Sequence, residues 1–346
     1  MSAARSANAN FWNTAGSNIA FVSSETFGGN LGGLAGADGQ CARLATAANL
    51  AGSYKAWLSS STIDARDRFA GARVWSLPDG RLIADTLTDL NAGKMAYPIH
   101  QDENGNIVDD EKVWTNTLGT GLRGPGAACS DWTTSSISVF SSPEGYTSGG
   151  PRAWSQYDSL GFVTACSVPK RLYCLGTATN GAPFPIGLPG KIAFVSSVGL
   201  TPGAGGVTSL DNRCVLDASN ASLSGTFKAL VATTSTAAST KLDMGADYLS
   251  RAGGYLGRGS DIAAGRVRAG AWATAAGVIV GLSNEETWSG ASLVTGVGST
   301  DSTCADWTST SGSLALSGLV NLGSTGWWRS QTGLCNRALR VYCFQQ

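Results

Sequence analysis

The sequence contains one histidine, His100, and few charged residues, which make up 14% of its 346 residues. A single histidine excludes a three-histidine zinc site and allows at most one Ser-His-Asp arrangement. The 24 basic and 24 acidic residues cancel, so the chain lacks the excess of positive charge that is typical of nucleic-acid-binding proteins. No run of apolar residues is long enough to predict a membrane-spanning helix.

Cysteine and glycine, by contrast, are well represented. The eight cysteines include no C-x-x-C pair, a spacing that would indicate a zinc knuckle or a redox motif. Their even number favours structural disulfides and therefore an oxidising, extracellular location. Residues 1–17 show no apolar core of a signal peptide, so we expect either a removed leader or another export route. The 46 glycines are about 13% of the chain against the usual 7% or so, which indicates many tight loops.

The chain repeats itself with an offset of about 173 residues. Ile19–Ser24 recurs as Ile192–Ser197, and Cys129-Ser-Asp-Trp132 recurs as Cys304-Ala-Asp-Trp307. The two copies also close alike, with R-L-Y-C at 171–174 and R-V-Y-C at 340–343. This self-similarity predicts a tandem duplication of one domain. A segment rich in proline and glycine, 177–190, separates the copies and is predicted to be a short linker.

Within each copy the pattern predicts an α+β fold. Residues 19–23 and 54–59 have the composition and alternation of strands, and apolar residues at helical spacing follow Asp38. We expect Asp38 to be the N-cap of that helix and Asp211 to be its counterpart before a helix at 212–223. Turn signals recur every 8–12 residues or so through the rest of each copy, as in an antiparallel sheet with long loops.

The motifs 33–42 (GLAGADGQCA) and 49–60 (NLAGSYKAWLSS), followed by 112–114 (KVW) and 129–132 (CSDW), resemble the endostatin domain of collagens. The whole chain is similar to a bacterial endostatin-like family that includes leptospiral surface proteins. The resemblance covers both copies. It implies an N-terminal extension at 1–17, one domain at 18–176, the linker at 177–190 and a second domain at 191–346.

The resemblance implies tandem C-type-lectin-like domains, each a twisted antiparallel sheet with about two helices and long loops. It also implies nested disulfides, which would join Cys41 to Cys174, Cys129 to Cys166, Cys214 to Cys343 and Cys304 to Cys335. From spacing alone, four cysteines in a copy allow three connectivities. The amino-terminal zinc-binding histidines, the arginine-rich heparin face and the calcium-dependent sugar-binding triplets of related proteins have no match here.

The acidic loop 102–111 is the best metal candidate by ligand type, because hard oxygen donors suit calcium. Its weak calcium candidates are Asp102, Asn104, Asn106 and Asp109. The loop lacks the glycine of an EF-hand at the sixth position and has no counterpart in the second copy. We therefore favour a solvated hairpin that turns at Asn104-Gly105. No resident cofactor is predicted.

No residue is predicted to be catalytic. A lone histidine near a strand end is more often packed than reactive, and no serine or cysteine motif accompanies His100. Asp131 and Asp306 occupy matching positions between a cysteine and a tryptophan. The simplest interpretation is structural, with each carboxylate bonded to loop amides beside a buried indole.

Aromatic residues in the loops are the best candidates for ligand contacts, because an aromatic face can stack on a sugar or anchor a protein. Tyr146, Trp154 and Tyr157 lie in one long loop, and Trp328 has no counterpart in the first copy. Trp154 also matches Trp327, and this correspondence favours a place in the core.

These features predict a non-enzymatic binding module that is secreted or displayed on a bacterial surface and recognises a glycan or a surface protein. The alternative is a structural subunit of an appendage, fibre or phage-like particle that assembles from copies of itself. Size-exclusion chromatography separates the two hypotheses, because a clean monomer excludes simple self-assembly. No nucleic-acid partner and no transmembrane segment are predicted.

Overall fold

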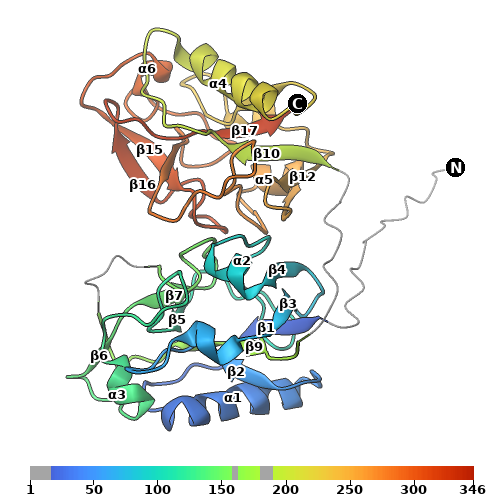
Figure 1. The fold of residues 1–346 in the computed structure, drawn as a ribbon. Helices are drawn as coiled ribbons and strands as arrows, with labels where there is room; N and C mark the ends of the chain where they lie inside the picture. The colour runs from blue at the N-terminus through green and yellow to red at the C-terminus, as the bar shows by residue number, and fades with distance from the viewer. Residues whose placement is uncertain (1–16, 158–162, 180–189) are drawn as a thin grey trace, which may run out of the picture.

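A computed structural model describes residues 17–157, 163–179 and 190–346. The predicted extension at 1–17 and linker at 177–190 lie mostly outside these residues. The two copies, called here the first and second repeats, form two bodies that pack end to end (Figure 1). The described residues combine sheets with a few helices, so the α+β prediction is confirmed.

The first repeat has one long helix beside a mixed sheet. Its elements are β1 (Asn18–Val22), α1 (Gly33–Ala47), β2 (Tyr54–Ala56), η1 (Ala65–Phe69), β3 (Arg73–Ser76), β4 (Leu82–Thr86), α2 (Leu87–Asn91), β5 (Lys112–Trp114), α3 (Ala128–Trp132), β6 (Phe140–Ser141), β7 (Glu144–Tyr146), β8 (Thr164–Ala165) and β9 (Arg171–Gly176). The sheet order is β4-β3-β1-β9-β5-β7, with β2 added on β9.

The second repeat has the same order of elements up to its third helix, after which three strands follow where the first repeat has four. Its elements are β10 (Lys191–Val195), α4 (Gly206–Asn220), β11 (Phe227–Ala229), η2 (Ala238–Lys241), β12 (Asp247–Ser250), β13 (Tyr255–Arg258), α5 (Gly259–Ala263), β14 (Glu286–Trp288), α6 (Cys304–Trp307), β15 (Leu314–Leu319), β16 (Gln331–Leu334) and β17 (Tyr342–Gln345). The strands β11-β17-β10-β12-β13 form one sheet and β14-β15-β16 another.

The sheets are mixed, whereas the sequence and the resemblance predict an antiparallel sheet. In the first repeat β1 pairs with β9 in antiparallel fashion but with β3 in parallel fashion. In the second repeat β10 pairs likewise with β17 and β12. The parallel pairs arise because α1 or α4 lies between the two strands in sequence, and such a long crossover returns the chain to the same end of the sheet.

Four disulfides fasten the chain, in the pairs that the family resemblance implies. They join Cys41 to Cys174, Cys129 to Cys166, Cys214 to Cys343 and Cys304 to Cys335. The longer bridge of each repeat ties its long helix to its last strand, and both sulfur atoms are buried in the core. Closing a loop of more than one hundred residues in this way contributes about 4–5 kcal/mol in the chain-entropy model.

The long helices begin earlier than predicted, so the capping role assigned to Asp38 and Asp211 is wrong. Helix α1 begins at Gly33 and α4 at Gly206, which places both aspartates inside a helix. The Asp38 carboxylate instead accepts hydrogen bonds from the Ala56 amide at 2.9 Å and the Arg68 guanidinium at 2.6 Å. Asp211 accepts in the same way from the Ala229 amide at 2.8 Å. Each aspartate thus joins its helix to the neighbouring strand.

Both repeats contain a left-handed turn of ordinary L-residues. All five residues of α3 have φ between 46° and 65°, and the four of α6 have φ between 48° and 67°. Left-handed helical backbone costs about 1–2 kcal/mol per residue, so other interactions must hold it. A disulfide leaves each turn from Cys129 or Cys304. The indoles of Trp132 and Trp307 are buried and donate to backbone carbonyls.

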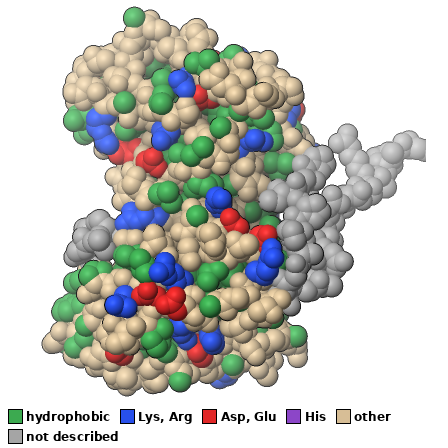
Figure 2. All heavy atoms as spheres, viewed as in Figure 1, with side chains coloured by type: hydrophobic (Ala, Val, Ile, Leu, Met, Phe, Trp, Pro, Cys, Tyr) green, Lys and Arg blue, Asp and Glu red, His purple; other side chains and the backbone are tan. Residues whose placement is uncertain are grey.

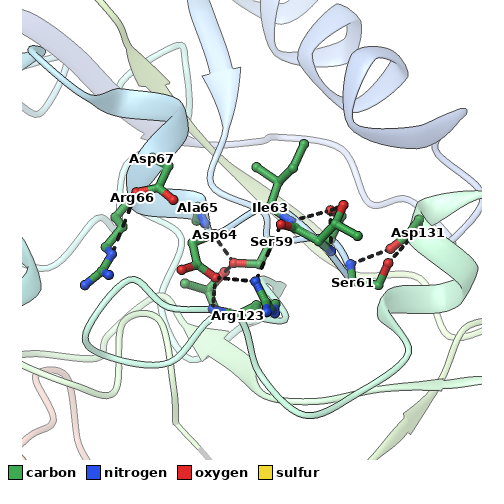
Figure 3. Close-up of polar contacts among 12 residues, drawn as sticks. Ser59, Ser61, Ile63, Asp64, Ala65, Arg66, Asp67, Arg123 and Asp131 are labelled. Carbon is green, nitrogen blue, oxygen red and sulfur yellow. Dashed lines mark hydrogen bonds and ion pairs between the residues drawn. The ribbon is translucent and has the colours of Figure 1, made fainter.

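Asp131 in the left-handed turn anchors the loop after β2, as Figure 3 shows. Its carboxylate accepts from the Ser61 amide at 2.6 Å and from the Ser61 hydroxyl at 2.7 Å. In the second repeat Asp306 accepts from the Thr234 amide at 2.7 Å and its hydroxyl at 2.8 Å. These contacts agree with the structural interpretation of the two aspartates.

The repeats meet through backbone hydrogen bonds between equivalent residues. Matching β7 with β15 aligns Ser148 with Asn321 and Gly150 with Gly323. The Gly150 amide donates to the Asn321 carbonyl at 2.8 Å, and the Gly323 amide donates to the Ser148 carbonyl at 2.7 Å. Such reciprocity is the mark of an isologous interface, so the two repeats are related by a pseudo-two-fold axis.

Side chains extend this contact into a shared core. The Trp272 indole, which is fully buried, donates across the interface to the Met95 carbonyl at 2.8 Å, and the Tyr97 hydroxyl accepts from the Tyr255 amide at 2.8 Å. Gly254 passes so close to the Ala96 carbonyl that a Cβ there would lie 2.0 Å from its oxygen. One hydrophobic cluster therefore includes residues of both repeats.

The surface carries no large patch of one sign on the face that Figure 2 shows, where acidic and basic side chains are interspersed. This distribution agrees with the zero net charge of the chain. Among the described residues, no helix is both long and apolar enough to cross a membrane.

We expect Asp131→Asn to lower the free energy of unfolding by about 1–3 kcal/mol, because the variant loses a charged acceptor of two hydrogen bonds. Asp67→Asn is the matched control, since Asp67 makes only a 3.9 Å exposed ion pair with Arg66 and should change stability by less than about 0.5 kcal/mol. Urea unfolding of both variants measures the difference. Equal stabilities would contradict the anchoring role.

Candidate ligand pocket between the repeats

A pocket of about 310 Å³ opens at the junction of the two repeats. Its volume is at the small end of ligand-binding pockets in proteins. Both repeats contribute polar side chains to its wall, which are His100, Asp109 and Asp110 from the first and Asp261, Arg266, Arg268 and Ser324 from the second. Because neither repeat makes the pocket alone, it depends on the interface described above.

His100 is fixed at the pocket by a short hairpin. Its carbonyl accepts from the Val108 amide at 2.7 Å, and the bridge between Gln101 and Ile107 closes the loop beyond it. The side chain is only 4% exposed. Burial and the nearby Arg81 guanidinium lower the pKa of His100 to about 3, so the imidazole is neutral at physiological pH.

The two ring nitrogens of His100 have different surroundings. Nδ1 lies 3.6 Å from an oxygen of Asp109, which is longer than a hydrogen bond, so only the charge of this carboxylate favours the tautomer with the proton on Nδ1. Nε2 is buried and has no hydrogen-bond partner among the described residues. A buried polar atom without a partner costs free energy, so this edge of the His100 ring would gain from a hydrogen-bond donor.

Two adjacent carboxylates face the same pocket. Burial, followed by repulsion from Asp110, raises the pKa of Asp109. The Asp110 backbone is left-handed, with φ of 59°, and its amide donates to the Ser148 hydroxyl at 3.0 Å. The Ser324 hydroxyl of the second repeat donates to the Asp110 carboxylate at 2.7 Å. The repeats are thus joined at the pocket by a hydrogen bond to a charged group.

The two arginines differ in their partners. Arg266 forms an ion pair with Asp261 at 2.9 Å. Arg268 is close enough to Asp109 to lower the pKa of that carboxyl, but it forms no ion pair within 4 Å among the residues that the structure describes. Its guanidinium therefore has donors to offer to a ligand.

The pocket is open on one side of the pseudo-two-fold axis and closed on the other. The carbonyls of His100 and Trp272 accept from equivalent amides, those of Val108 and Val280, so the two residues are counterparts. The indole fills its side, where a Cβ on Gly150 would lie 2.4 Å from its ring. The smaller imidazole leaves space at the equivalent place.

The four predicted ligand-binding aromatics fall into two groups. Tyr146 and Tyr157 stack with ring centroids 4.4 Å apart and pack near the interface against Leu319 and Leu322. Burial and the Asp110 carboxylate, to which the Tyr146 hydroxyl is hydrogen-bonded, raise the pKa of Tyr146, and Asp110 belongs to the pocket wall. The segment 158–162 of the same loop lies outside the described residues.

Trp154 and Trp328 require a correction. Trp154 is fully buried against Trp57 and Tyr173, and Trp328 is 3% exposed beside Trp327. Neither indole presents a face to which a ligand on the surface could bind. Both large apolar side chains are used to fill the core instead.

The acidic loop is organised by its own hydrogen bonds. The Asp102 carboxylate accepts from the Asn104 and Asn106 amides at 2.9 Å, whereas Asp109 contacts His100 and Ser148. These contacts do not bring the four calcium candidates together around one point. In the described part of the chain, no group of three or more His, Cys, Asp or Glu side chains could hold a metal ion.

The sequence predicts a packed rather than a catalytic His100 and does not connect this residue with Asp110, Arg268 or Ser324. A signal was available in the repeat itself, because the duplication places a polar histidine opposite a tryptophan. One repeat thus has an imidazole at the position where the other packs an indole.

Compared with known proteins, the chain matches no protein-family model and no curated sequence.

The neutral state of His100 has a consequence for stability. Its folded pKa of about 3 lies below the unfolded value of about 6.5, so the unfolded chain binds more protons between these values. Stability is therefore full above about pH 6.5 and falls as the pH is lowered toward 3. From about pH 7 to pH 5 this one group should remove about 2 kcal/mol.

His100→Gln should flatten that pH dependence by the same amount, because glutamine does not titrate. Urea unfolding of both proteins at the two pH values gives the comparison, in which the other groups cancel. The imidazole signals of the single histidine can also be followed by NMR. A titration midpoint near 6.5 in the folded protein would contradict the burial argument.

Proposed function

We propose that the chain is a tandem pair of endostatin-like, C-type-lectin-like domains that acts as a non-enzymatic extracellular binding module. It recognises a glycan or a surface protein, and the ligand group enters the pocket between the repeats. The observation that carries the proposal is His100, which lines this pocket and whose buried Nε2 has no hydrogen-bond partner among the described residues. Unpaired buried polar atoms at a pocket are typical of ligand sites.

The lectin-like assignment is supported by features that both repeats share. Each has one long helix, two nested disulfides, and a first strand that pairs with the last. An extracellular location is supported by the four disulfides, which persist in oxidising compartments. The long polar loops sit on a scaffold fastened by these bridges, and rigid scaffolds with variable loops suit recognition.

A binding role is favoured over catalysis by the state of the polar groups. His100 is neutral, and its free nitrogen touches no hydroxyl among the described residues. All eight cysteines are in disulfides, so none offers a thiolate nucleophile. Asp110 accepts from the Ser324 hydroxyl, and Asp261 pairs with the Arg266 guanidinium. Neither contact is part of a Ser-His-Asp arrangement.

The test is an array of glycans and extracellular matrix proteins, screened with the intact chain and with His100→Trp. The second repeat has a tryptophan, Trp272, at the equivalent position. The substitution should therefore fill the pocket and preserve the fold. We expect the intact chain to bind at least one probe and the variant to lose that binding at least tenfold.

Arg268→Ala provides a second variant, since Arg268 is exposed and forms no ion pair in the described structure. It should weaken the same binding without affecting the fold, which circular dichroism checks. No binding above background by the intact chain, with or without calcium, would refute the proposed function. Binding that both variants retain in full would refute the pocket as its site.

A further inference from the structure

We infer that the pocket between the repeats binds a protonated primary amine, carried by a small ligand rich in oxygen atoms such as an amino sugar or an amino acid. This inference deepens the proposed function and rests on it. The argument uses the charges that remain unpaired at the pocket, the hydrogen-bonding capacity of its acceptors, and the comparison of its two pseudo-symmetric sides.

The charge balance at the pocket favours a cation. Asp261 and Arg266 neutralise one another at 2.9 Å. Asp109 and Asp110 are left against the single guanidinium of Arg268, so one negative charge remains. The Asp110 carboxylate accepts from the Ser324 and Tyr146 hydroxyls, and the Asp109 carboxylate contacts His100 and Ser148. None of these neutral groups cancels the charge, whereas an ammonium group does.

The acceptors match an ammonium group in number. A primary ammonium has three N–H donors and no acceptor. The pocket wall presents acceptor oxygens on Asp109 and Asp110, and it includes His100, whose buried Nε2 has no partner among the described residues. An anion would find three acceptors and repulsion here, and an apolar group would leave Nε2 without a partner. The buried nitrogen thus favours a ligand that donates.

Arg268 is suited to the other end of the ligand. Its guanidinium offers up to five N–H donors, and these recognise carboxylate or hydroxyl oxygens. An amino acid would place its carboxylate there, and an amino sugar would place its ring hydroxyls there. The volume of about 310 Å³ limits the bound group to a small one.

The other side of the pseudo-two-fold axis has uncharged residues at the equivalent positions. Glu111 and Glu285 accept from equivalent amides, those of Thr147 and Val320, so Asn284 is the counterpart of Asp110. Trp272 is the counterpart of His100. The second repeat therefore has an uncharged amide and an indole at these positions, although its segment before Glu285 is longer and only Asp110 has a left-handed backbone.

The experiment is isothermal titration calorimetry of the full chain at about pH 6, where amines are protonated, with four probes. These are glucosamine, N-acetylglucosamine, serine and N-acetylserine. We expect glucosamine or serine to bind and its own acetylated form to bind at least tenfold more weakly, because acetylation removes the charge and two donors. The pair that shows the difference identifies the source of the amine.

Asp110→Asn should weaken the binding of that amine at least tenfold, since it installs the residue of the second repeat. Asp301→Asn is the control, because it also removes one carboxylate but lies at an exposed position that contacts Ser313. His100→Trp should abolish the binding. A thermal melt of each variant confirms that it is folded.

Two results would overturn the inference. If an acetylated probe binds as tightly as its amine, or if Asp110→Asn has no effect, the ammonium contact is wrong. If none of the four probes binds, the ligand class is wrong. Neither result tests the proposed function. That function is tested by binding on the array and by the loss of that binding in His100→Trp.

Discussion

The reciprocal pair of backbone hydrogen bonds between Gly150 and Asn321 and between Gly323 and Ser148 is the contact on which the rest of the arrangement depends. Because the bonds join equivalent residues, they fix the second repeat relative to the first by a single rotation. Trp272 and Tyr97 then pack across the same junction. The repeats share one core, and the pocket exists only while they remain in contact.

A symmetric interface between unequal repeats produces an asymmetric site. The indole of Trp272 fills one side of the axis, and the imidazole of His100 leaves the other side open. Duplication makes this possible because each copy can change independently, whereas two identical subunits would carry the same residue at both places. The indole of Trp272 thus stabilises the scaffold, and the imidazole of His100 at the equivalent position makes the site polar.

Much of the fold could be predicted from the sequence, because its signals are local or repeated. The duplication, the α+β class and the first strand of each repeat follow from matching motifs and periodicity. The extent of the long helices did not follow, since Asp38 resembles an N-cap but bonds to Arg68 and the Ala56 amide from within the helix. The parallel pairing of β1 with β3 depends on the path of a crossover, which composition does not encode.

The site was less predictable, because it is formed by residues more than 150 positions apart. Nothing local connects Asp110 with Ser324 or His100 with Arg268, and exposure decides that Trp154 belongs to the core. The most direct test of the shared interface is hydrogen exchange at the Gly150 and Gly323 amides. Both should exchange only through global unfolding and at equal rates. Rapid exchange of both amides in a chain that is otherwise protected would show that the repeats separate, and would contradict the account.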